Sequence, residues 1–265
     1  MLSTRWSASL RTAASKVPEV TIYFWVIKVL ATTVGETAAD SLSSNLHLSL
    51  TATTLLMSVL LAAGLAFQFR APRYVPGIYW LAVVLISIVG TLITDNLTDN
   101  FGVSLKLSTV LFAIALAVAF AVWYANERTL SIHSIDTPRR EGFYWLAILF
   151  TFALGTAAGD LLAETLDVGY WRSAVLFAAA IALVAALWRY ARLNPILAFW
   201  IAYILTRPLG ASLGDFLSQH RGDGGLGLGT AVTSALFLAT IAAVVVHLTR
   251  TGKDQAPVAP AGTTA

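Results

Sequence analysis

FWVIKVLATTVGETAAD, residues 24–40, carries a pattern that the chain repeats three more times. An aromatic residue precedes Trp, Gly comes ten residues after the Trp, and Asp comes five residues after the Gly. The same elements recur without a gap in YWLAVVLISIVGTLITD (79–95), YWLAILFTFALGTAAGD (144–160) and FWIAYILTRPLGASLGD (199–215). Self-similarity of this kind indicates a chain built by duplication of one structural unit.

Each copy lies in an apolar run long enough to cross a bilayer as a helix. The chain of 265 residues is 57% hydrophobic and only 12% charged, with a mean hydropathy of +0.75. A soluble domain would carry about a quarter charged residues. We therefore expect an all-α polytopic membrane protein with eight transmembrane helices, arranged as four parallel two-helix repeats with pseudo-fourfold (two-times-two) symmetry. The predicted spans are 20–44, 48–69, 76–98, 103–125, 142–165, 170–190, 195–218 and 226–249.

The basic residues predict the orientation. Of the 17 Lys and Arg residues, twelve lie in the two terminal segments and the even-numbered connections, three lie in the odd-numbered connections, and two lie inside spans. The positive-inside rule then places both termini in the cytoplasm. The predicted organisation is a basic cytoplasmic arm (1–19), repeats 1 and 2 (20–125), a cytoplasmic linker (126–141), repeats 3 and 4 (142–250) and a disordered tail (251–265).

Two sets of repeated residues are assigned to packing. The tryptophans stand near the cytoplasmic start of each odd-numbered span, where an interfacial aromatic belt is expected. The glycines stand in mid-span, where small residues let helix backbones approach closely; a local helix break that binds an ion is the alternative. The sets are Trp25, Trp80, Trp145 and Trp200, and Gly35, Gly90, Gly155 and Gly210.

Four repeated acids, Asp40, Asp95, Asp160 and Asp215, predict an ion-binding site. Pseudo-symmetry places them around one axis at one depth, and intramembrane acids mark ion pathways. One helical turn earlier on the same face stand Glu36, Thr91 and Thr156. Hydroxyls near the starts of the even-numbered helices complete the predicted set: Thr53, Ser108, Ser173 and Ser234. The alternatives are that the acids lie at helix ends and snorkel or cap, and that the hydroxyls cap backbone groups.

Two basic residues, Lys28 and Arg207, interrupt the repeat inside the spans. Along their own helices, Glu36 lies two turns above Lys28 and Asp215 lies two turns above Arg207. Internal ion pairs that fix packing are one interpretation. A gating or charge-coupling relay between the carboxylates is the other.

The four aromatic–Trp pairs and Gly-x4-Asp elements resemble a bacterial family of integral membrane proteins, described as four tandem copies of a two-span repeat of unknown function. The resemblance covers about residues 20 to 250. It implies a fold and a location in the bacterial inner membrane, and it supplies no activity.

The leading functional hypothesis is a transporter or channel for a cation, either a divalent metal such as Mn²⁺ or Mg²⁺ or a proton-coupled species. Carboxylates and hydroxyls without any cysteine favour hard cations, so a bound divalent cation is the candidate cofactor. The alternative is a membrane scaffold that binds lipid or a partner and satisfies its acids internally. We expect no enzyme, because no nucleophile or zinc motif is present, and no nucleic-acid partner; the expected partners are the lipid bilayer and a small cation.

Overall fold

The computed structural model describes residues 15–45 and 48–255. The described residues form eight α-helices, with a π-helical turn after two of them and short 3₁₀ turns in two connections. The elements are α1 (Ile22–Asn45), α2 (Leu50–Arg70), α3 (Pro76–Asp95), η1 (Asn96–Asn100, π), α4 (Leu105–Glu127), η2 (Ile132–Ser134), α5 (Pro138–Asp160), η3 (Leu161–Thr165, π), α6 (Tyr170–Tyr190), α7 (Pro195–Ser218), η4 (Arg221–Asp223) and α8 (Thr230–Thr251).

Seven of these helices, α2 to α8, are long and apolar enough to cross a membrane. The protein is therefore a helical protein of membrane type, as its composition predicts. The helix α1, which carries Lys28, Glu36 and Asp40, is not one of the seven.

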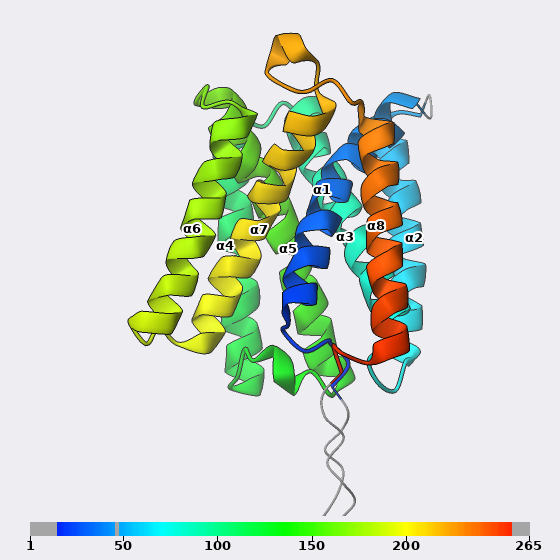
Figure 1. Cartoon of the computed structure of the whole chain (residues 1–265), viewed down its shortest axis with the longest axis vertical. Coiled ribbons are helices and arrows are strands. Elements are labelled where there is room, and N and C mark those ends of the chain that lie inside the picture. Colours follow the sequence, from blue (N-terminus) through cyan, green and yellow to red (C-terminus); the bar gives the residue numbers. More distant parts are fainter. Residues whose placement is uncertain (1–14, 46–47, 256–265) are drawn as a thin grey trace, which may run out of the picture.

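The odd-numbered helices form an inner ring and the even-numbered helices cover it. Around the ring α1 packs on α3, α3 on α5, α5 on α7, and α7 back on α1 (Figure 1). On the outside α2 packs on α3, α4 on α5, α6 on α7, and α8 on α1. The apolar spans of α3, α5 and α7 are 50–72% buried, whereas those of α2, α4, α6 and α8 are only 17–22% buried. The outer helices thus present apolar side chains such as Leu55, Val118 and Leu236 to the surroundings.

The repeated glycines hold the inner ring together, and their contacts run in a closed cycle. Each glycine faces the residue that stands three positions before the next glycine in the repeat. A Cβ added at each would lie 2.5–2.7 Å from the Cβ of that residue, in the pairs Gly35–Ser87, Gly90–Phe152, Gly155–Arg207 and Gly210–Thr32. Because a real Cβ cannot approach so closely, only glycine allows these backbones to meet.

Replacing Gly90 with Ala is expected to destabilise the ring. The new methyl group would meet Phe152, and forcing extra atoms into a packed core costs about 1–3 kcal/mol. Gly77 in the same helix is the matched control, because a Cβ there meets nothing within 4 Å. In thermal unfolding in detergent, Gly90→Ala should therefore have a lower midpoint than wild type. Gly77→Ala should not lower the midpoint. Equal midpoints for the two variants would contradict the proposed role of the close contact.

The aromatic–Trp pair of each repeat closes a second cycle nearer the helix starts. In each repeat, the aromatic residue that precedes the Trp contacts the Trp of the next inner helix, with ring centroids 5.5–6.3 Å apart. The pairs are Phe24–Trp80, Tyr79–Trp145, Tyr144–Trp200 and Phe199–Trp25. Trp80, Trp145 and Trp200 are 1–4% exposed. The expectation of an interfacial belt is therefore wrong for these three, because the outer helices separate the inner ring from the lipid.

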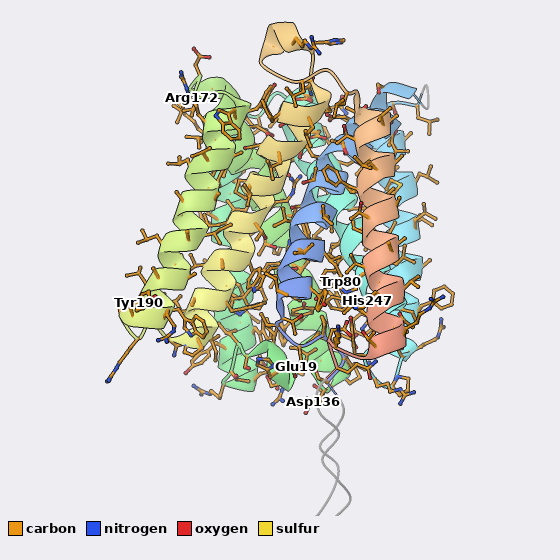
Figure 2. All side chains as sticks on the ribbon, viewed as in Figure 1. Glu19, Trp80, Asp136, Arg172, Tyr190 and His247 are labelled. Carbon is orange, nitrogen blue, oxygen red and sulfur yellow. The ribbon has the colours of Figure 1, made fainter. Side chains whose placement is uncertain are left out.

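Both ends of the described chain lie at the same end of the bundle, here called the N/C end (Figure 1). Figure 2 shows Glu19 and Asp136 at this end and Arg172 at the opposite, far end. The segment 15–20 is bound across the N/C end by backbone hydrogen bonds from Lys16 to Ile135 and from Glu19 to Asp254.

Parts of the predicted arm, linker and tail pack or form helix at this end. Lys16, which belongs to the predicted basic arm 1–19, is buried and its Nζ lies 2.7 Å from Glu141 Oε2. Asp254, predicted in the disordered tail, is buried and accepts a hydrogen bond from the Tyr74 hydroxyl. Burial and this carboxylate raise the pKa of Tyr74 above its ordinary value. Helix α5 begins at Pro138, so the end of the predicted linker 126–141 is helical. Residues 1–14 and 256–265 lie outside the described part.

Candidate functional site

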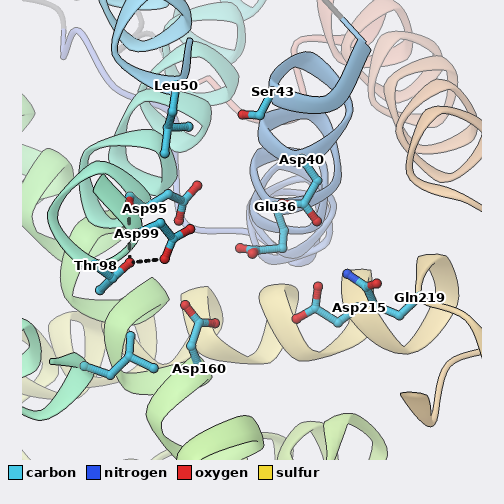
Figure 3. A pocket seen from close by; sticks show the side chains of 11 residues that line it. Glu36, Asp40, Ser43, Leu50, Asp95, Thr98, Asp99, Asp160, Asp215 and Gln219 are labelled. Carbon is cyan, nitrogen blue, oxygen red and sulfur yellow. Dashed lines mark hydrogen bonds between the residues drawn. The ribbon is translucent and has the colours of Figure 1, made fainter. Parts of the chain in front are cut away.

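A cavity of about 320 Å³ lies at the far end, inside the inner ring. It is lined by Glu36, Asp40, Ser43, Leu50, Asp95, Thr98, Asp99, Leu105, Asp160, Asp215 and Gln219. Six of these residues are acidic, and we call the cavity they line the carboxylate vestibule. Figure 3 shows Glu36, Asp40, Asp95, Asp160 and Asp215 converging on it from α1, α3, α5 and α7.

The repeat explains how the four aspartates come together. Each lies five residues after a ring glycine, so the closed ring brings all four to one height around the axis. Asp95 and Asp160 are the last residues of α3 and α5, and a π-helical turn follows each. Such turns are rare and frequent at functional sites. The structure thus brings together the four acids that the sequence pattern singles out.

Asp99, which the sequence analysis missed, also lines the vestibule. It lies in η1, four residues beyond Asp95, and its neighbour Thr98 donates a hydrogen bond to its carboxylate. The signal was available in the sequence, because residues four apart on a helix share a face.

Three of the acids are close enough to share one metal ion. One carboxylate oxygen from each of Glu36, Asp160 and Asp215 can be chosen so that the three lie within 4.8 Å of one another. Glu36 and Asp215 are each 6% exposed. Carboxylate oxygens at this spacing suit a hard divalent cation such as Mg²⁺, Ca²⁺ or Mn²⁺.

Arg207 contacts the vestibule residue Glu36 and joins all four inner helices. From α7, its Nη2 donates to Glu36 Oε2 of α1 at 2.7 Å and to Thr156 Oγ1 of α5 at 2.7 Å. The same nitrogen donates to Thr91 Oγ1 of α3, across the ring. Glu36, Thr91 and Thr156 therefore do point to one place inside the ring, and the Arg207 guanidinium binds all three there.

The carboxylate that Arg207 contacts at 2.7 Å is that of Glu36, on the neighbouring helix α1. Arg207 and Asp215, the partner expected along α7, are eight positions apart, about 12 Å along the helix axis. Glu36 lies only one turn above the height of Arg207. This ion pair is therefore formed between helices.

Lys28 does not pair with Glu36. Its Nζ is fully buried and, among the described residues, has no hydrogen-bond partner. It lies over the rings of Phe152 and Tyr203, 3.9 and 4.2 Å from their centroids. Because Arg207 already occupies Glu36, Lys28 is held by aromatic faces alone.

The four hydroxyls of the outer helices do not line the vestibule. Thr53, Ser108, Ser173 and Ser234 are buried where each outer helix packs on the back of an inner one. Ser234 Oγ lies 2.7 Å from Thr37 Oγ1 of α1. The capping alternative is not seen for the first three, because the hydroxyl oxygens of Thr53, Ser108 and Ser173 have no hydrogen-bond partner among the described residues.

A comparison with protein families matches the chain four times. The family model described as Repeat of Unknown Function (DUF347) covers residues 23–74, 78–129, 143–194 and 198–254. Each match begins in an inner helix and extends beyond the outer helix that follows it, so the matched unit is the two-helix repeat. No curated protein and no solved structure matches the chain.

The four matches together span most of the 265 residues, and they coincide with the four structural units of the ring. The chain therefore belongs to the family built from this Repeat of Unknown Function (DUF347), in four tandem copies.

Proposed function

We propose that this protein is an integral membrane transporter for a divalent cation, which binds in the carboxylate vestibule. The observation that carries the proposal is the convergence of six acidic residues on one cavity at the far end of the bundle. A single guanidinium, that of Arg207, contacts this group through Glu36. Close carboxylates repel one another unless a cation or protons neutralise them.

All eight helices span the membrane in this proposal, α1 included, around a pseudo-fourfold axis. The closed cycles of glycine and aromatic contacts support that arrangement. The position of α1 supports it as well, because the charged residues Lys28, Glu36 and Asp40 face the ring interior while other helices shield them. Intramembrane charges are tolerated where they face a bundle interior and find partners there.

The distribution of basic residues supports an inner-membrane location with both termini in the cytoplasm. The N/C end is then cytoplasmic, and the vestibule faces the outside. The protein acts without enzymatic chemistry in this proposal, and its partners are the lipid bilayer and a small cation.

Alternating access fits the core better than an open pore. Beneath the vestibule, Arg207 bonds to α1, α3 and α5 and fills the axis. Nearer the N/C end, the hydroxyls of Tyr79 and Tyr144 meet at 2.5 Å within the aromatic cycle. Passage to the cytoplasm thus requires these side chains to rearrange.

A scaffold that holds its acids for structural reasons is the second candidate. The observation that favours it is the contact of Arg207 with Glu36, Thr91 and Thr156, which satisfies part of the polar core internally. A scaffold predicts that cations neither bind nor cross.

Reconstitution in liposomes tests the proposal. The purified chain is expected to admit Mn²⁺ into vesicles that contain a quenched dye, with Mg²⁺, Ca²⁺ and protons assayed in parallel. Empty vesicles and vesicles with heat-unfolded protein are the controls. If wild-type protein in correctly folded form moves none of these cations, transport is excluded and the scaffold remains.

A further inference from the structure

Lys28 is a buried amine that the vestibule does not use. Its side chain starts from α1 and reaches Phe152 of α5, the helix diagonally opposite in the ring, so it crosses the axis. It is 0% exposed, and its Nζ has no hydrogen-bond acceptor among the described residues. An ammonium group normally donates three hydrogen bonds, so a buried one without acceptors is costly in its charged form.

A second cation lies close to Lys28. The Arg207 guanidinium carbon is 5.9 Å from the centroid of the same Phe152 ring that Lys28 covers, so one aromatic ring contacts both cations. Two of the three guanidinium nitrogens of Arg207, Nε and Nη1, also lack partners within the described chain. The Ser87 and Tyr203 hydroxyls in this layer are buried and unpartnered as well.

Among the described residues, the side chains that contact the Lys28 ammonium come from α5 and α7. From α7 comes Tyr203, with Arg207 nearby, and from α5 comes Phe152. At the height of Lys28 the repeat places Val83 of α3 and Ile148 of α5, which carry no charge. The titratable His247 of α8 contacts Tyr23 instead. Arg207 contacts the Glu36 carboxylate directly, whereas Lys28 Nζ has no hydrogen-bond partner within the described residues.

We propose that Lys28 is the proton carrier that couples cation transport to an opposing proton movement, an inference that rests on the proposed function. A cation bound at Glu36 competes with Arg207 for that carboxylate. The positive charge of Arg207 is then less neutralised, and its repulsion of a Lys28 ammonium grows. The ammonium releases one proton to the water on the side from which the cation binds, and becomes a neutral amine. After the cation leaves on the opposite side, the amine takes one proton from the water there.

The residue type and the surroundings both suit this role. Lysine changes protonation readily when it is buried, whereas arginine stays charged. One turn nearer the N/C end, the paired hydroxyls of Tyr79 and Tyr144 lie in the next layer of the axis. They provide polar groups through which a proton can pass between Lys28 and the cytoplasm, on the side opposite the vestibule.

The test compares proton-coupled and uncoupled transport of Mn²⁺ in proteoliposomes. Lys28→Arg keeps the charge but cannot release a proton, and Lys28→Met removes both. Both variants are expected to lose accumulation of Mn²⁺ driven by a pH gradient by about tenfold or more, because arginine does not deprotonate in proteins. Exchange of radiolabelled Mn²⁺ for Mn²⁺, which needs no net proton movement, should persist. Arg250→Gln, at an exposed position in α8, is the control.

A second measurement does not require transport. Calorimetric titration of Mn²⁺ in buffers of different ionisation enthalpy counts the protons released on binding. Wild type should release more protons than Lys28→Arg. Gradient-driven accumulation that survives in a folded Lys28→Arg overturns the inference and leaves the proposed function standing. Wild-type protein that neither binds nor exchanges Mn²⁺ overturns both.

Discussion

Replacing Arg207 with Met is expected to lower the free energy of unfolding by about 3–5 kcal/mol, the cost of leaving one partner of a buried ion pair alone. Arg207 is fully buried, and its partner Glu36 is 6% exposed. Without the guanidinium, Glu36 keeps a charge with no opposite charge beside it, and Thr91 and Thr156 lose the donor that joins them. The effect should be large because one side chain connects α7 to the three other inner helices.

The double variant Arg207→Met with Glu36→Gln separates the ion pair from simple packing. Removing both charges is expected to restore much of the stability, since a buried ion pair replaced by neutral groups costs little. Arg189→Met, at an exposed position in the last turn of α6, should leave the unfolding midpoint unchanged. Chemical unfolding in detergent, followed by tryptophan fluorescence, measures all three variants. If Arg207→Met alone is as stable as wild type, the Arg207–Glu36 contact does not stabilise the fold.

The second large effect concerns the metal ligands. Asp160→Asn together with Asp215→Asn is expected to weaken Mn²⁺ binding by about 100-fold or more, equivalent to about 3 kcal/mol. The change removes two of the three carboxylates whose oxygens lie within 4.8 Å of one another. Asparagine keeps the size and one oxygen of each side chain but removes its negative charge, and the affinity of such sites follows the charge of their ligands.

Thermal unfolding provides the measurement, because a ligand at 100 times its dissociation constant stabilises the folded state by about 2.7 kcal/mol. Wild type should gain stability with added Mn²⁺, and the double variant should not. Without metal, the double variant is expected to be the more stable of the two, since fewer carboxylates repel one another. The matched control, Asp167→Asn with Asp223→Asn, changes two exposed acids in connections at the same end of the bundle. An equal response to Mn²⁺ in both double variants would place the metal elsewhere.

The repeat made the helices and the acid cluster predictable. A pattern that recurs four times at matched spacing places equivalent residues at equivalent positions. The repeat therefore predicts that Asp40 and its three counterparts lie at one height in the bundle. The glycine contacts follow for the same reason. These predictions depend only on periodicity along each helix and on closure of the ring.

The partner of Arg207 was not predictable in this way. It depends on how far one helix is displaced along its neighbour, and the two residues of the pair are 171 positions apart. The tryptophans were misplaced because residues near the end of a span fit a lipid interface and a packed core equally well. What decides between them is whether a second layer of helices covers the first.

The closed inner ring has a consequence for how the protein is made. Helix α1 is synthesised first, but its ring neighbour α7 and its outer cover α8 come last. At about 5–20 residues per second, the 171 residues that separate Glu36 from Arg207 take roughly 9–34 seconds to translate. During that interval Lys28, Glu36 and Asp40 have no completed core to enter. The nascent first helix must therefore stay without its completed core until the last repeat emerges and closes the ring.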